Sequence, residues 1–545
     1  MLPKAGKSRR SASLRTLIFV SSFMVFAGVL PAAAETTAMV TASDSALAVG
    51  DSVAPTYDAG WENATFLANV APTQYTGSMY WLTNGVTGAS QYWDAGWTGS
   101  GVGVALIDTG VVPVNGLTAP GKIINGPDLS FESQSDGFRY LDTYGHGTHM
   151  AGIIAGRDTG ASIVSGNATD FLGMAPGAKI LNVKVADREG AVDISQVIAG
   201  IDWVIQHRND PGLDIRVLNL SFGTNSIQPY EFDPLAFVVE KAWKAGIVVV
   251  VAAGNDGNPS ALRNPAISPF IIAVGASIEN ATYSASDDTV ASFSNCGTTS
   301  RGVDLVAPGK SILSLRNPGS TADSDHPEAV VDDRFFLGSG TSQAAAVVSG
   351  AAALVIQQRP SITPDQLKKL FKDTAQPIPG ATTLCQGSGL LNLASARLAP
   401  TPSAKDASQK YTPSAGNGSI ESARGADHLT ANGVRLEGEK DIMGRAWTGW
   451  CANLPSIKRS AQDCVETFWS GGNWNGTSWS GTSWSGTSWS GTSWSGTSWS
   501  GTSWSDMYWS GTSWSGTSWS GTSWSGTSWS GTSWSTPRTR GQSWG

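Results

Sequence analysis

Val-Leu-Asn-Leu (217–220), Pro-Leu-Ala-Phe-Val-Val-Glu-Lys-Ala-Trp-Lys (234–244) and Ile-Val-Val-Val-Val-Ala (247–252) are three consecutive segments that decide the fold. The first and third are short apolar runs, which is typical of strands buried on both faces. The middle segment has its apolar residues at helical spacing. A strand, a helix and a second strand in this order predict one unit of a parallel sheet.

The same alternation begins earlier in the chain. Strand-like runs at Val102–Ile107 and Ile180–Val185 are each followed by a helical pattern, at Thr148–Ala155 and Ser195–His207. The sequence therefore predicts an α/β domain with a mostly parallel sheet and helices on both faces. In such sheets the reactive groups gather beyond the carboxyl ends of the strands. Asp108 lies at one of these ends.

Three blocks of sequence carry residue types that suit nucleophilic catalysis. They are Ile-Asp-Thr-Gly (107–110), Tyr-Gly-His-Gly-Thr-His-Met-Ala-Gly (144–152) and Gly-Ser-Gly-Thr-Ser-Gln-Ala-Ala (338–345). A serine hydroxyl becomes a good nucleophile only when a neighbouring base removes its proton. A histidine can act as that base near neutral pH, and an aspartate can hold its ring in the useful tautomer. The three blocks predict a serine, histidine and aspartate triad.

In their order and spacing the three blocks resemble the subtilisin-like serine peptidases, the subtilases. The resemblance covers roughly 300 residues, from Trp93 to Leu393. It implies a subtilisin-like fold and a secreted bacterial serine endopeptidase that cuts proteins or peptides. It also implies that Asp108, His146 and Ser342 are the catalytic triad.

The resemblance assigns further residues to the site. Asn255 matches the family's side-chain donor to the oxyanion, the negative oxygen that forms during acyl transfer. The walls of the primary specificity pocket are two three-residue segments: Ser221, Phe222, Gly223, Ala252, Ala253 and Gly254. A purely structural role for Phe222 in the core is the alternative. Asp256 is expected to favour a basic or polar substrate side chain near this pocket.

Composition limits the partners. The chain has 545 residues, only 14% of which are charged, and a formal net charge of -8. An acidic protein gains little from the phosphate backbone, so nucleic acid is not expected as a partner. No cofactor is required by the triad chemistry. Many subtilases bind structural calcium, but the sequence assigns no site to calcium or to another metal.

The first 34 residues resemble an export signal. Basic side chains up to Arg15 precede an apolar run, Leu17–Leu30, and small residues that end at Ala34. This layout predicts a cleaved signal peptide and a secreted, extracellular protein, with a retained signal anchor as the alternative. The expected division is a signal peptide at 1–34, an N-terminal extension or pro-region at 35–85, a catalytic domain at 86–398, a linker at 399–430, a small Cys- and Trp-bearing segment at 431–470, and a repeat tail at 471–545.

The four cysteines and five histidines were each considered for a role. In an exported protein Cys296, Cys385, Cys451 and Cys464 can pair in three ways, and we favour a Cys451–Cys464 bond because these two lie close in sequence. Outside the triad, His149 is expected to pack structurally. The remaining histidines are expected at the surface: His207, His326 and His428.

A five-residue repeat fills the C-terminal tail. Gly-Thr-Ser-Trp-Ser occurs six times from Gly476 to Ser505 and five more times up to Ser535. Regularly spaced Trp beside hydroxyl groups suits binding to cell-wall polymers or polysaccharides; self-association through β stacking and a plain low-complexity linker are the alternatives. The competing function for the whole chain is a surface scaffold that acts through these repeats and uses proteolysis only for processing.

Overall fold

A computed structural model describes residues 77–133, 135, 137–257, 260–280, 282–431, 434–442 and 447, together with short strands near 472, 480, 500 and 520. The predicted signal peptide and the predicted Cys451–Cys464 bond lie outside the described residues, and so does nearly all of the predicted repeat tail. Within the part of the chain that the structure describes, no helix combines the length and apolar character needed to cross a membrane.

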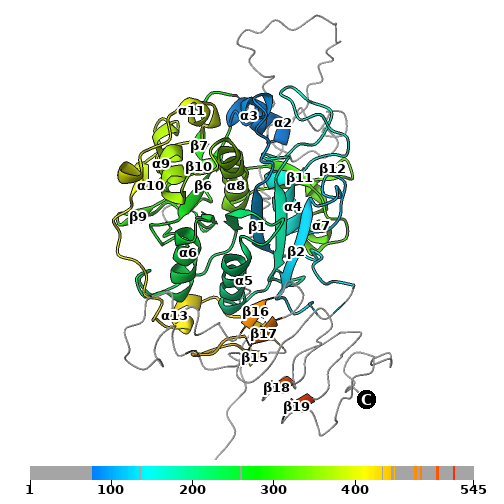
Figure 1. Ribbon diagram of the computed structural model, residues 1–545, viewed down its shortest axis with the longest axis vertical. Helices are drawn as coiled ribbons and strands as arrows, with labels where there is room; N and C mark the ends of the chain where they lie inside the picture. The colour runs from blue at the N-terminus through cyan, green and yellow to red at the C-terminus, as the bar shows by residue number, and fades with distance from the viewer. Residues whose placement is uncertain are drawn as a thin grey trace, which may run out of the picture.

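A parallel sheet forms the centre of the molecule (Figure 1). Its strands lie in the order β10-β6-β5-β4-β1-β3-β2, and β7 joins β6 in the antiparallel direction. Their bounds are β1 Gly103–Asp108, β2 Ile123–Asp128, β3 Lys179–Lys184, β4 Ile215–Leu220, β5 Val248–Ala252, β6 Ile272–Ile278, β7 Thr289–Val290 and β10 Leu305–Pro308. The α/β fold with a mostly parallel sheet, predicted from the sequence, is confirmed.

Helices cover both faces of this sheet. The helices form two pairs: α5, between β3 and β4, packs against α6, between β4 and β5, whereas α4, between β2 and β3, packs against α8. Both α6 and α8 contact β5, and both α5 and α8 contact β1, so the two pairs cover different faces of the same strands. The long helices are α4 His146–Ala155, α5 Ile194–His207, α6 Pro234–Lys244, α8 Thr341–Gln358 and α9 Pro364–Thr374.

Smaller elements complete the described part of the chain. The helical turns are α2 Met79–Trp81, η2 Leu82–Val86, α3 Ser90–Asp94, α7 Thr321–Asp325, η3 Pro327–Ala329, α10 Thr383–Gln386, α11 Leu393–Leu398, α12 Ala404–Ala407 and α13 Ile420–Arg424. The remaining strands are β8 Gly297–Thr298, β9 Arg301–Gly302, β11 Ile312–Leu315, β12 Val330–Val331, β13 Phe335–Gly338, β14 Thr430–Ala431, β15 Val434–Arg435, β16 Gly472–Trp474, β17 Trp479–Gly481, β18 Trp499–Gly501 and β19 Trp519–Gly521.

The catalytic unit extends beyond its expected limits at the N-terminal end. Residues 77–85 were assigned to the N-terminal extension, but here they pack into the core: Leu82 is fully buried, and the carbonyl of Gly77 accepts a hydrogen bond from Leu313 N at 2.9 Å. Burial of an apolar side chain on this scale makes the segment part of the folded unit.

The C-terminal side also differs from the linker expected at 399–430. The chain leaves α11, follows the edge of the molecule and reaches α13 at its opposite end (Figure 1). We call residues 419–442 the strap. Its Arg424 side chain is fully buried and pairs with the equally buried Asp193, with 2.7 Å between Arg424 Nε and Asp193 Oδ2. Asp193 also caps the N-terminus of α5. A linker-like composition therefore forms an ordered segment because contacts with distant residues, this ion pair among them, hold it against the domain.

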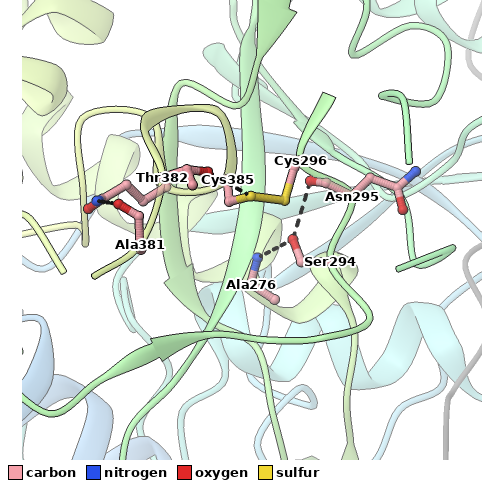
Figure 2. Close-up of a disulfide and its surroundings, with 8 residues drawn as sticks. Ala276, Ser294, Asn295, Cys296, Ala381, Thr382 and Cys385 are labelled. Atoms are coloured by element: carbon pink, nitrogen blue, oxygen red, sulfur yellow. Dashed lines mark hydrogen bonds between the residues drawn. A yellow bond between two sulfur atoms is a disulfide. The ribbon is translucent and has the colours of Figure 1, made fainter. Parts of the chain in front are cut away.

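A disulfide closes a long loop of the catalytic unit. Cys296 and Cys385, 89 residues apart, are joined, and Figure 2 shows the bond between the segments that follow Asn295 and Thr382. The bond excludes the two connectivities that would pair Cys296 with either of the more C-terminal cysteines.

Candidate active site

Asp108 and His146 lie at the edge of the sheet where β1 ends and α4 begins. The distance between His146 Nδ1 and Asp108 Oδ1 is 2.7 Å, and both side chains are buried. The strand ends at Asp108 because its carboxylate turns back to accept from the Thr109 backbone N–H at 2.8 Å. The two residues thus form the hydrogen bond that a base and its orienting acid need.

A second carboxylate, missed in the sequence, supports this pair. Asp142 is buried and accepts hydrogen bonds from the backbone N–H groups of Gly145 at 2.6 Å and Thr148 at 2.8 Å. It also accepts from Thr109 Oγ1 at 2.8 Å, and that hydroxyl lies 3.3 Å from Asp108 Oδ1. The only signal in the sequence was an aspartate four residues before His146, which is also typical of an ordinary turn.

The glycines beside His146 allow the two segments to meet. A Cβ on Gly147 would lie 2.1 Å from the carbonyl oxygen of Gly110, and Gly145 has φ 112°. Neither position accepts a larger residue without a shift of the backbone. The glycine-rich block therefore brings the start of α4 against the end of β1.

Ser342 is the second residue of α8 and is buried. The first N–H groups of a helix have no carbonyl partner within that helix, so they point toward a group bound at its N-terminus. The carbonyl of Ser342 accepts a hydrogen bond from Ser221 Oγ at 3.4 Å. This helix start is well suited to stabilise negative charge next to the serine hydroxyl.

Asn255 is anchored through one end of its amide. Its Oδ1 accepts from Thr341 N at 2.8 Å and from Thr341 Oγ1 at 2.9 Å. Its Nδ2 is buried and has no hydrogen-bond partner among the described residues. A Cβ built on Gly340 would lie 3.2 Å from this nitrogen, so the donor lies at the N-terminus of α8. The geometry leaves an N–H donor available beside Ser342.

Packing joins the two halves of the site. Helix α4, which begins at His146, packs against α8, which carries Ser342, and α8 packs in turn on β4, β5 and β6. Asn255 follows β5 through Gly254, whose φ of 115° forms the turn. The four residues predicted for catalysis therefore come from two strand ends and two helix starts at one edge of the sheet.

Comparison with known proteins now identifies the family. Residues 99–418, more than half of the chain, match the model of the subtilase family. The chain belongs to the subtilase family. Over 303 residues it is 39% identical to serine protease AprX of Bacillus subtilis, covering 54% of this chain and 66% of that one. Over 279 residues it is 33% identical to minor extracellular protease Epr of the same organism, covering 51% and 36%.

A solved structure is similar over part of its length. The crystal structure of fervidolysin from Fervidobacterium pennivorans matches with a TM-score of 0.44 and 29% sequence identity, covering 57% of this chain and 44% of that one.

The segments predicted to bind substrate follow β4 and β5 of this subtilase. Phe222 is 3% exposed and belongs to the hydrophobic core, and Ala253 is fully buried. Asp256 is already paired: Arg263 Nε lies 2.6 Å from its Oδ2. Arg263 thus offsets the charge of Asp256, and the expectation that Asp256 favours a basic or polar substrate side chain stays a prediction.

The histidines outside the pair differ in burial. His149 is fully buried and its Nε2 lies 3.1 Å from the carbonyl of Phe336, which confirms its structural role. Burial, with a smaller effect from His146, lowers the pKa of His149 to about 3. The surface position expected for His428 is wrong: it is 4% exposed, because it packs within the strap, where its Nε2 lies 2.8 Å from Glu421 Oε1.

The electrostatics of the loop before His146 are set by carboxylates. Burial and the nearby carboxylates of Asp325 and Asp142 raise the pKa of Tyr144 to about 12.

Across the described residues, no group of three or more His, Cys, Asp or Glu side chains is placed to hold a metal ion. The structure therefore assigns no residues to structural calcium.

Proposed function

We propose that this subtilase is a secreted serine endopeptidase in which Ser342 is the nucleophile. The observation that carries the proposal is the buried hydrogen bond between His146 and Asp108, at the start of a helix that packs against the helix carrying Ser342. Structural pairs of histidine and aspartate are common. Here the pair lies at the same edge of the sheet as the buried Nδ2 of Asn255, which has no hydrogen-bond partner among the described residues.

Each residue has a defined part in the proposed reaction. Ser342 Oγ attacks the carbonyl carbon of the peptide bond while His146 takes its proton. His146 then gives the proton to the leaving amine, and water hydrolyses the resulting acyl-enzyme by the same route. Asp108 stabilises the imidazolium that forms in each step. All of these steps use groups of the chain, so the reaction needs no cofactor.

Asn255 and the first turn of α8 stabilise the oxyanion. Because Thr341 holds Asn255 Oδ1 from two sides, the amide is fixed before substrate arrives. A donor that is already oriented stabilises developing charge without having to reorganise, and this is the main source of its catalytic effect.

Proteins or peptides are the proposed substrates, and the extracellular space is the proposed location. The relatives named above are proteases, and one of them is named as an extracellular protease. The signal-like layout of residues 1–34 supports export. Sequencing the N-terminus of protein recovered from the medium tests this: a start beyond residue 34 supports export with cleavage, and full-length protein held in the cells contradicts it.

The experiment that tests the activity is casein hydrolysis by the parent chain and by Ser342→Ala. Ser395→Ala is a matched control, because Ser395 is an exposed serine of α11. We expect the parent and the control to hydrolyse casein, a serine-directed inhibitor to stop both, and Ser342→Ala to be inactive. Equal activity of the parent and Ser342→Ala would refute the mechanism.

A further inference from the structure

Arg263 lies between the two segments predicted to bind substrate. A Cβ on Gly223 would lie 2.5 Å from Arg263 Cβ, and a Cβ on Gly254 would lie 2.6 Å from Arg263 Cγ. The Arg263 backbone N–H also donates to the carbonyl of Ala253 at 2.9 Å. The aliphatic stem of one arginine therefore occupies the space next to both segments, and both of these glycines are needed to admit it.

Each of the three guanidinium nitrogens of Arg263 donates a hydrogen bond to a carboxylate. Nε donates to Asp256 Oδ2 at 2.6 Å and Nη2 donates to Asp256 Oδ1, which makes the pair bidentate. Nη1 donates to Asp427 Oδ2 at 3.1 Å. Burial opposes ionisation of Asp256, but hydrogen bonds from Arg263 and Asn295 hold its pKa below the ordinary value. The positive charge of Arg263 is therefore offset from two sides.

One of these two carboxylates comes from the strap. Asp427 Oδ2 also accepts from the Asn225 backbone N–H at 2.8 Å, and the Asp427 N–H donates to the carbonyl of Arg424. Arg424 in turn is held by its buried pair with Asp193. The strap thus holds a charged group against Arg263 through a contact between residues 164 positions apart.

We propose that Arg263 determines which substrate side chain this enzyme accepts at the primary position, the residue whose carbonyl is attacked, and that Asp427 of the strap offsets its charge. This inference rests on the proposed function and adds the substrate class. The stem leaves little room between the two segments, so small uncharged side chains are favoured over aromatic ones. Because two carboxylates offset the guanidinium charge, acidic side chains gain little there.

The test uses tetrapeptide p-nitroanilides that differ only at the primary position, with Ala, Phe or Glu. The parent is compared with Arg263→Ala, which removes the stem, and Arg263→Met, which keeps a stem but removes the charge. Asp427→Asn keeps the shape and removes one carboxylate. Glu437→Gln is the matched control, because Glu437 is an exposed acid of the strap that pairs with Arg435 and has no contact with Arg263.

We expect Arg263→Ala to raise kcat/KM for Phe relative to Ala by at least about tenfold, the size that a change of pocket volume produces. Arg263→Met leaves that ratio near the parent value. Asp427→Asn raises kcat/KM for Glu relative to Ala severalfold, because one of the two carboxylates that offset the guanidinium charge is lost. The control leaves both ratios unchanged.

The outcomes separate this inference from the proposed function. An active Arg263→Ala enzyme with the parent's ratios overturns the inference and leaves the function intact. A parent that cleaves neither the peptides nor casein overturns the function, and the inference with it. If Arg263→Ala does not fold, Asp427→Asn decides: an active enzyme with the parent's Glu to Ala ratio overturns the inference.

Discussion

The loop before His146 and the strap are both fixed by a buried carboxylate, but the two carboxylates act over very different distances along the chain. The carboxylate of Asp142 takes its hydrogen bonds from residues no more than 33 positions away, mostly from backbone N–H groups beside His146. Asp193 is paired with Arg424, 231 positions away. Similar chemistry thus holds the base in place and closes the C-terminal segment onto the domain.

The loop before His146 and the strap therefore differ in the property that a substitution impairs. A loop held by several short-range backbone hydrogen bonds loses orientation when one acceptor changes, and catalysis depends on orientation. A segment whose contacts with the domain include a fully buried ion pair leaves an uncompensated charge when either partner changes, and folding stability depends on that. We therefore expect changes near Asp142 to alter kinetics and changes near Arg424 to alter stability.

The largest expected effect is on stability, in Arg424→Met. Removing one partner of a buried pair leaves Asp193 charged without compensation, so the free energy of unfolding falls by about 3–5 kcal/mol. Urea unfolding of the variant, in a Ser342→Ala background that prevents self-digestion, measures this. Glu437→Gln, at an exposed position of the strap, changes the free energy of unfolding by less than about 1 kcal/mol. Equal unfolding midpoints for Arg424→Met and the Ser342→Ala background would contradict the predicted effect of the buried pair on stability.

Asn255→Ala tests the catalytic side. Loss of the oriented amide lowers kcat by about 100–1,000-fold, a magnitude measured for this donor in subtilisin, a relative, with little change in KM. Thr341→Val removes only one of the two anchors of Asn255 and lowers kcat less, because the backbone N–H still holds Oδ1. Steady-state kinetics on a peptide anilide measure both variants. A kcat for Asn255→Ala equal to that of the parent contradicts the assigned role.

Asp142→Asn should act through His146 without unfolding the protein. The new amide NH₂ replaces an acceptor that faces backbone donors, so the loop shifts and kcat falls by up to about 100-fold, the cost of a misplacement of about 1 Å. The pH profile of kcat/KM is the informative readout, because a purely structural change would leave its limbs in place. Parent-like kcat and pH profile in this variant would remove Asp142 from the positioning of His146.

The smallest expected effect, taken per pH unit, is the loss of folding stability in acid that His149 causes. Its folded-state pKa of about 3 is below the unfolded value, so its contribution to stability is fully present above about pH 6.5 and is lost as the pH falls toward 3. Each pH unit in this window costs about 1.4 kcal/mol. Unfolding midpoints between pH 4 and 7 should fall less steeply in His149→Gln than in the Ser342→Ala background. If the unfolding midpoints of the two proteins depended on pH equally, other groups would be the cause of the loss of stability in acid.

The same contrast explains what the sequence could predict. The α/β sheet followed from strand and helix periodicities, which are local, and the segments that carry Asp108, His146 and Ser342 followed from short motifs. Asp142 was missed because a single aspartate four residues before a histidine has no distinctive pattern.

The strap could not be predicted in this way. Residues 399–430 have the composition of a linker, and the burial of Arg424 and His428 depends on partners supplied by distant segments or by the strap's own fold. Arg263 was missed for the same reason, since its importance comes from two glycines and a carboxylate that only the folded chain brings together.

Mass-spectrometric mapping after reaction with a fluorophosphonate tests the central claim most directly. Such reagents phosphorylate a serine only when a neighbouring base activates it. The account predicts one adduct per molecule, on the peptide that contains Ser342, and predicts that Ser342→Ala and denatured parent protein take up none. An adduct on another serine with full loss of casein hydrolysis, or hydrolysis that survives complete modification of Ser342, would contradict it.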